Sequence, residues 1–169
     1  KAGIALVPED RKKQGLVLGN SVAFNLTLSS LRFYMNGIAI SEKKRGEVID
    51  HYSQRLRIKA ASPEIEAGSL SGGNQQKIVI AKWLNSNPKI FMFDEPTAGV
   101  DIVAKGEIIS IIREFADKGG AVIFASSELA EMMAICDDII TIFDGKITGR
   151  IGRKELMKEE ELQHAIQRK

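Results

Sequence analysis

Hydrophobic residues along the chain follow two spacings, and each spacing predicts a different element. Short, continuous apolar runs occupy residues 3–7, 90–93 and 121–125. Runs of this length predict strands, and we expect the strand at 90–93 to be buried on both faces and the strand at 121–125 to be buried. Elsewhere apolar residues such as Ile49 and Tyr52 recur every three or four positions, which is the spacing of one helical face. Strands and helices alternate in the second half, and this alternation predicts an α/β fold with a largely parallel sheet.

Capping residues and helix breakers set the expected ends of the helices. Ser41 and Asp101 are suitable N-caps, and Lys118-Gly119 is a suitable helix end. The polar stretch 8–15 reads as a loop. The predicted helices cover residues 21–31, 71–84, 101–118, 128–134 and 153–167, together with one that begins at Ser41 and stops before Ala60.

A two-residue turn is expected near the end of the chain. Asp144-Gly145 stands between two apolar runs, and this dipeptide favours a β-hairpin because both positions take a positive φ. We therefore expect three parts along residues 1–169: a mainly helical subdomain at 15–86, an α/β core at 88–152 and a C-terminal helix at 153–169.

Composition narrows the class of protein. With 169 residues, 44% hydrophobic and 27% charged, the chain is long enough for one core and has the composition of a soluble globular protein. A net charge of +2 is too small to indicate a nucleic-acid partner. The single cysteine, Cys136, excludes an internal disulfide framework and a cysteine-based zinc site.

Residues 70–76, Leu-Ser-Gly-Gly-Asn-Gln-Gln, lie where a helix is expected to begin. The first backbone amides of a helix have no intrahelical partner and carry a partial positive charge. Gly72 and Gly73 have no Cβ to keep an anion away, and Ser71 adds a hydroxyl. The segment is therefore typical of a phosphate site, while an ordinary glycine-rich turn capped by the serine explains it equally well.

Residues 90–97 place two carboxylates, Asp94 and Glu95, at the end of a predicted buried strand. Ligands of α/β proteins bind at such strand ends. An aspartate there can hold Mg²⁺, and a glutamate beside it can orient or deprotonate an attacking water. A strand that simply ends in a solvated acidic turn is the alternative.

The two segments together resemble the signature and Walker B motifs of the ATP-binding-cassette (ABC) ATPases, because residues 70–75 precede the Asp94-Glu95 strand end by about twenty residues. Residues 98–101, Ala-Gly-Val-Asp, stand where that family has its D-loop. The segments 7–12, 15–18, 71–77 and 126–128 look like the second cassette of the double-cassette ATPases that power bacterial importers of ribose- and galactose-type monosaccharides.

The resemblance covers nearly the whole chain and implies a partial P-loop NTPase (RecA-like) core of ABC type with a helical signature subdomain. The 169 residues contain no G-x-x-x-x-G-K-[ST] Walker A motif, because Asn74 stands where the lysine of the nearest match would be. We therefore expect the chain to be the C-terminal portion of a longer protein, inactive as an ATPase by itself. Strands that the family places upstream would cover part of the core, so exposed apolar surface is expected.

The resemblance also implies a role for individual residues. The signature residues Ser71, Gly72, Gly73, Asn74 and Gln75 would bind ATP held by a second ABC ATPase domain, packed head to tail. In the chain's own site, Asp94 would bind Mg²⁺ and Glu95 would be catalytic. The remaining candidates are Asp101 in the D-loop, Ser127 in place of the switch histidine, and Glu9 in place of the Q-loop glutamine. The last two replacements imply slow hydrolysis at that site.

The expected function is ATP hydrolysis that drives import of a simple sugar. The resemblance implies transmembrane permease subunits as partners, a periplasmic sugar-binding protein as an indirect partner, and a cytoplasmic location on the inner face of the membrane. Two alternatives stay open. One is a non-transport ABC ATPase of DNA repair or translation, and the other is a non-catalytic regulatory module with the same fold.

Overall fold

The computed structural model describes residues 3–36 and 39–152. The chain divides into two compact units, Lys1–Ile123 and Phe124–Lys169. The boundary falls within the predicted α/β segment 88–152. None of the described helices is both long and apolar enough to cross a membrane.

The first unit is built on a small sheet with strand order β1-β4-β5. Strands β1 (Ile4–Val7) and β4 (Ile90–Asp94) pair in parallel, with Ile4 opposite Ile90 and Val7 opposite Phe93. Alternate side chains of this pair are buried on one face, namely Ala5, Val7, Phe91 and Phe93. The parallel pair and the helices around it confirm the predicted α/β class.

The opposite face of the sheet is open among the described residues. Ile4 and Leu6 are 53% and 47% exposed. In β5 (Ala121–Ala125), Ile123 is 55% exposed. The prediction of a buried strand at 121–125 is therefore wrong on this face. Burial of residues 90–93 on both faces is incomplete, because Ile90 and Met92 are half-buried. The exposed side chains on this face agree with the exposed apolar surface that the resemblance led us to expect.

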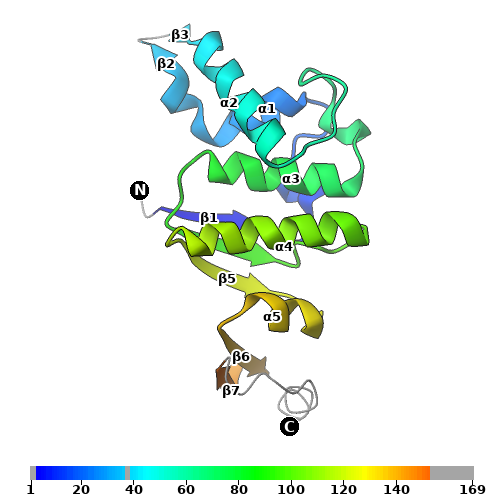
Figure 1. Cartoon of the computed structure of the whole chain (residues 1–169), viewed down its shortest axis with the longest axis vertical. Coiled ribbons are helices and arrows are strands. Elements are labelled where there is room, and N and C mark those ends of the chain that lie inside the picture. Colours follow the sequence, from blue (N-terminus) through cyan, green and yellow to red (C-terminus); the bar gives the residue numbers. More distant parts are fainter. Residues whose placement is uncertain (1–2, 37–38, 153–169) are drawn as a thin grey trace. The chain divides into compact units, whose positions relative to one another are not determined.

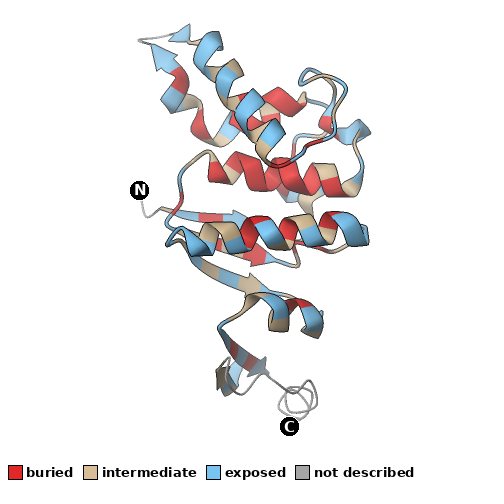
Figure 2. Ribbon diagram, viewed as in Figure 1, coloured by how far each residue is buried: buried red, intermediate tan, exposed pale blue. Residues whose placement is uncertain are grey.

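Two long helices, α3 (Gly72–Leu84) and α4 (Ile102–Asp117), run side by side along the covered face (Figure 1). Both confirm the sequence prediction. Helix α3 is buried along nearly its whole length (Figure 2). Helix α4 begins where the Asp101 carboxylate accepts a 3.0 Å hydrogen bond from the Ala104 amide, and Phe115 packs edge-on against Phe91.

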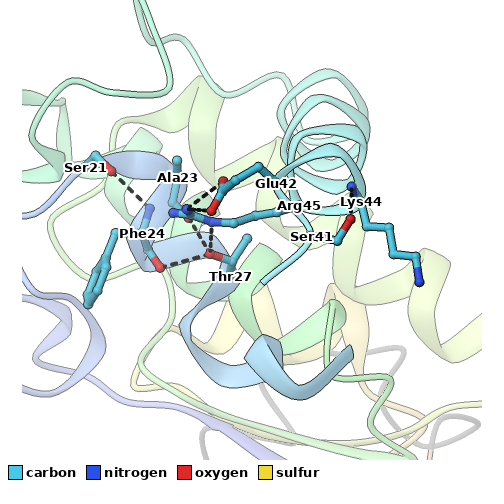
Figure 3. Close-up of polar contacts among 8 residues, drawn as sticks. All are labelled: Ser21, Ala23, Phe24, Thr27, Ser41, Glu42, Lys44 and Arg45. Atoms are coloured by element: carbon cyan, nitrogen blue, oxygen red, sulfur yellow. Dashed lines mark hydrogen bonds and ion pairs between the residues drawn. The ribbon is translucent and has the colours of Figure 1, made fainter. Parts of the chain in front are cut away.

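A helical region comprises α1 (Val22–Thr27), the 3₁₀ segment η2 (Leu28–Tyr34) and α2 (Glu42–Arg55). Side chains join α1 to α2 (Figure 3). The Arg45 guanidinium donates to the Thr27 hydroxyl at 3.2 Å and also pairs with Glu42. The Thr27 hydroxyl in turn donates to the Ala23 carbonyl at 2.7 Å. Ser41 caps α2 as predicted, accepting a hydrogen bond from the Lys44 amide.

Three details of this unit differ from the sequence prediction. The expected helix 21–31 becomes 3₁₀ after Thr27, with Ser30 outside helical φ/ψ. The expected loop 8–15 contains η1 (Arg11–Gly15), one π-helical turn that Asp10 caps. Two short strands, β2 (Met35–Asn36) and β3 (Ala39–Ile40), and a 3₁₀ turn, η3 (Ala67–Ser69), were not expected.

The second unit contains α5 (Leu129–Ile135) and a hairpin of β6 (Asp138–Phe143) and β7 (Lys146–Gly152). Asp144 and Gly145 have φ of +49° and +72°, which confirms the predicted turn. Ile139 is the centre of a small core. The neighbours packed against it are Leu129, Met132, Met133, Cys136 and Ile151. The predicted helix 153–167 lies outside the described residues.

Candidate functional site

The start of α3, which we call the helix tip (residues 71–73), begins with a serine whose side chain makes no capping hydrogen bond to the helix. Ser71 has the extended backbone of an N-cap residue, but its hydroxyl accepts no hydrogen bond from an amide of the first turn. The hydroxyl instead accepts a 2.9 Å hydrogen bond from the Asn74 side chain. Ser71 therefore stands at the N-cap position without a side-chain capping bond, and its carbonyl accepts a 3.0 Å hydrogen bond from the Gln75 amide. Both the phosphate site and the ordinary glycine-rich turn stay open as interpretations of this segment.

Neighbouring segments leave little room for a side chain at either glycine of the tip. A Cβ on Gly72 would lie 2.6 Å from the Arg11 guanidinium and 3.0 Å from the Gly99 carbonyl oxygen. A Cβ on Gly73 would lie 2.6 Å from the Cβ of Ala104. Access for an anion was the reason expected from sequence, and close approach of neighbouring segments is a second reason that the sequence did not reveal.

Asn74 and Gln75 direct their side chains toward backbone around the tip. The Asn74 oxygen accepts a 2.8 Å hydrogen bond from the Lys59 amide. The buried Gln75 side chain donates to the Leu70 carbonyl at 3.0 Å and to the Ala67 carbonyl at 3.3 Å. Both side chains thus hold the tip on the segments that precede it, and a contact of either with nucleotide stays a prediction.

The carboxylates lie where the sequence predicted, at the end of β4. Asp94 is exposed, and Glu95 is half-buried with a φ of +43°. A positive φ is unfavourable for a glutamate, by about 1–3 kcal/mol, and such conformations concentrate at functional sites. No group of three or more metal-ligating side chains occurs in residues 3–36 and 39–152. Binding of Mg²⁺ by Asp94 stays a prediction.

The loop after Glu95 returns the chain to the helix tip. Amides of Ala98 and Val100 donate to the carbonyls of Glu95 and Thr97 at 3.1 and 3.2 Å. Asp101, exposed at the end of this loop, caps α4 and lies 3.5 Å from the Cβ position of Gly73. We call residues 98–101 the tip-facing loop. The structure thus brings Gly72, Gly73 and Asp101 together.

Arg11 is the site residue that sequence reasoning missed. In the basic run 11–13, Lys12 and Lys13 are exposed, as expected for a solvated face. Arg11 is half-buried, and its guanidinium donates a 2.9 Å hydrogen bond to the Ala98 carbonyl. Exposed Glu9 lines a 260 Å³ hollow next to it, together with Asp10, Arg11, Lys12 and Ala98. No charge pattern in the sequence distinguishes Arg11 from the lysines that follow it.

Two lysines of α3 are buried, which was also unexpected. Lys77 forms a 2.5 Å ion pair with Glu107 of α4. Lys82 donates a 2.6 Å hydrogen bond to the Gly15 carbonyl, and burial lowers the pKa of its ammonium. Both lysines fix α3 to its neighbours at points away from the helix tip.

Ser127 belongs to the second unit, whereas the other predicted site residues belong to the first. It is exposed. Its neighbour Ser126 donates a 2.9 Å hydrogen bond to the Glu131 carboxylate and accepts one of 3.0 Å from the Glu128 amide. The grouping of Ser127 with the carboxylates stays a prediction.

Comparison with known protein families finds a match to the family described as "ABC transporter" over residues 2–98. The ribose import ATP-binding protein RbsA of Bacillus subtilis is 43% identical over 159 residues, which is 94% of this chain and 32% of that protein. The xylose import ATP-binding protein XylG of Moorella thermoacetica is 43% identical over 157 residues, 93% of this chain and 31% of that protein. The chain thus spans about a third of the length of these relatives.

Solved structures show the same fold at lower identity. A dimeric ATP-binding cassette in a post-hydrolysis state, bound to ADP and phosphate, superposes with a TM-score of 0.75 at 22% identity. The match covers 89% of this chain and 62% of that one. Part of a Clostridium perfringens ABC transporter complex gives 0.75 at 23% identity, covering 98% of this chain and 63% of that one. The α/β architecture is therefore that of ABC ATPases.

Proposed function

This chain belongs to the ABC transporter family, and from that premise we propose that it is part of the ATP-binding and ATP-hydrolysing subunit of an importer of a simple sugar. The observation that carries the proposal is the identity of 43% over 94% of the chain to a ribose import ATP-binding protein. The ribose-import and xylose-import relatives support a monosaccharide cargo.

In the proposed assembly, the helix tip binds the phosphates of ATP held by a second ABC ATPase domain. The amides at the start of α3 and the Ser71 hydroxyl would donate to phosphate oxygens, since a helix N-terminus favours an anion. The Ser71 hydroxyl is available for this because it makes no capping bond to the helix. The two domains would pack head to tail, so that each tip completes the other domain's site.

The two carboxylates would serve ATP bound by the P-loop of the same domain, which these 169 residues do not contain. Asp94 would hold Mg²⁺ through its exposed carboxylate. The ion, when bound, neutralises charge on the β- and γ-phosphates. Glu95 would orient a water for in-line attack on the γ-phosphate and accept its proton. Ser127 lacks the imidazole of a switch histidine, and Glu9 replaces an amide with a charge, so this site should hydrolyse slowly.

The same proposal sets the partners and the location. The subunit would sit on the cytoplasmic face of the cell membrane, bound to transmembrane permease subunits. A periplasmic sugar-binding protein would deliver the cargo to those permeases. No nucleic-acid partner is proposed, in keeping with the net charge of +2.

ATP hydrolysis by the complete ATPase that carries these residues tests the proposal. Ser71→Ala should lower turnover at least about tenfold, because Ser71 would complete the site of the second domain. Glu95→Gln should lower turnover by a smaller factor, because the site that it serves is expected to hydrolyse slowly. Ser62→Ala and Glu64→Gln, which change the same residue types in the 62–64 turn, should leave it unchanged. A normal rate in both site variants would reject the proposal, and an assembly that binds ATP without turning it over would support a non-catalytic module.

A further inference from the structure

Arg11 lies between the helix tip and the tip-facing loop and contacts both. On the loop side, its Nη1 donates a 2.9 Å hydrogen bond to the Ala98 carbonyl. On the tip side, its Nη2 occupies the space of a side chain at position 72, because a Cβ built on Gly72 would lie 2.6 Å from it. The planar guanidinium therefore fills the gap between two segments that are far apart in sequence.

The turn that carries Arg11 is itself fixed at both ends. At its start, the Asp10 carboxylate accepts hydrogen bonds from the amides of Lys12 and Lys13 at 3.2 and 3.1 Å. The bond from the Lys13 amide is the main reason that the pKa of Asp10 lies below its ordinary value. At the end of the turn, the Lys82 ammonium donates to the Gly15 carbonyl at 2.6 Å.

Gly15 also packs directly on α3. A Cβ built on Gly15 would lie 2.9 Å from a methyl group of Val79, so the turn and the helix are in close contact at this point. Arg11 is thus held by a turn that is anchored on the same helix whose tip its guanidinium touches. This arrangement leaves little freedom for the tip to move independently of the turn.

The shape of the side chain matters more than its charge. One guanidinium nitrogen is used for the Ala98 carbonyl, and a second fills the space above Gly72. A lysine has one ammonium and could do only the first of these. The Nε of Arg11 is buried and has no hydrogen-bond partner in the part of the chain that the structure describes.

We propose that Arg11 is a positioning residue, which joins the helix tip and the tip-facing loop into one rigid surface and so presents both together to the ATP of the second domain. This inference rests on the proposed function. Arg11 itself touches no reacting atom. Its effect is on how the two segments are held relative to each other, and a small displacement of such groups is costly for turnover.

Steady-state kinetics of the complete ATPase provide the first test, with Arg11→Ala and Arg11→Lys compared to Lys12→Ala. Both Arg11 variants should lower kcat about tenfold and change KM for ATP less than about twofold, because initial ATP binding depends on the other domain's P-loop. The exposed Lys12 lies next to Arg11, so its removal should leave both constants unchanged. An Arg11→Lys variant with wild-type kcat would overturn the inference.

Hydrogen exchange of the same proteins gives a readout independent of activity. Amides of residues 72–74 and 98–101 should exchange faster in both Arg11 variants, while amides of α2 should be unaffected. Unchanged exchange at the tip and the loop would overturn the inference. If Arg11→Ala unfolds the whole protein, the amides of α2 will exchange faster as well. The test then rests on Arg11→Lys, which is the milder substitution.

A double-mutant cycle with Gly72→Ala tests the contact directly. In the wild-type background the added methyl collides with the Arg11 guanidinium and approaches the Gly99 carbonyl oxygen. In the Arg11→Ala background only the second contact remains, so Gly72→Ala should reduce turnover by a smaller factor there. Purely additive effects would contradict the contact.

The failure of this inference can be told apart from failure of the proposed function. If Ser71→Ala and Glu95→Gln keep normal turnover, the proposed function is rejected and the inference falls with it. If those two variants lose turnover while both Arg11 variants keep it, the proposed function stands and the role of Arg11 alone is rejected.

Discussion

Gly73 of α3 and Ala104 of α4 approach so closely that a methyl group on Gly73 would lie 2.6 Å from the Ala104 Cβ. Contacts this short are not found between carbon atoms in folded proteins, so one helix would have to shift. The glycine is therefore needed for α3 and α4 to meet at the helix tip, whether or not a ligand binds there.

Gly73→Ala should destabilise the chain by about 1–3 kcal/mol through overpacking, as measured by urea unfolding. Gly106→Ala is the matched control, because it adds the same methyl to an open, exposed position of α4. It should be neutral or stabilising by up to about 1 kcal/mol. If Gly73→Ala is as well tolerated as Gly106→Ala, the close approach of the two helices is incorrect.

Ser71→Ala should change the free energy of unfolding by less than about 0.5 kcal/mol, because the hydroxyl makes no bond to the helix backbone. Ser21→Ala is the comparison, since the Ser21 hydroxyl accepts a 3.1 Å hydrogen bond from the Phe24 amide. Its loss should cost about 1 kcal/mol. A large stability loss for Ser71→Ala would mean that the serine caps α3 after all, and that a fall in turnover has a structural origin.

Sequence reasoning was most successful where the signal is local. Asp101 caps its helix and Asp144-Gly145 forms its turn because a few neighbouring residues determine both conformations. The left-handed φ of Glu95 had no such signal, because nothing about a glutamate favours it.

Contacts between distant segments were the part that sequence reasoning missed. In the sequence, Arg11 is one residue of a basic run, and nothing in the sequence indicates its contact with the distant Ala98. Exposed apolar surface was expected from the resemblance, but the residues that form it were not identified from the sequence, for a related reason. An apolar run shows that a strand can be buried, but the elements packed on each face decide whether Leu6 or Ile123 is covered.

The Lys77–Glu107 ion pair should be strongly coupled. The Lys77 side chain is 4% exposed, and its ammonium is 2.5 Å from the Glu107 carboxylate. Glu107→Ala should cost about 3 kcal/mol in urea unfolding, because it leaves a buried charge without its counter-ion. Lys77→Met combined with Glu107→Ala should cost less than Glu107→Ala alone. A double variant that shows the sum of the two single losses would contradict this coupling.

Lys82 should make stability depend on pH in the alkaline range. Burial lowers the pKa of the folded-state ammonium below its ordinary value of 10.5. Between the lowered pKa and 10.5 the unfolded chain therefore binds more protons than the folded chain, so the contribution of Lys82 to stability rises with pH through this window. Lys82→Met abolishes the titration but leaves the Gly15 carbonyl without its donor.

The measurement is the difference in unfolding free energy between the wild-type chain and Lys82→Met, taken at about pH 7 and about pH 10. The difference should shift in favour of the wild type at the higher pH, because deprotonation removes the cost of a buried charge while the amine can still donate to the Gly15 carbonyl. Lys43→Met, which removes an exposed ammonium from α2, corrects for the general loss of one positive charge. A difference that is flat or falls with pH, after this correction, would mean that the Lys82 ammonium is as well solvated in the folded chain as in the unfolded one.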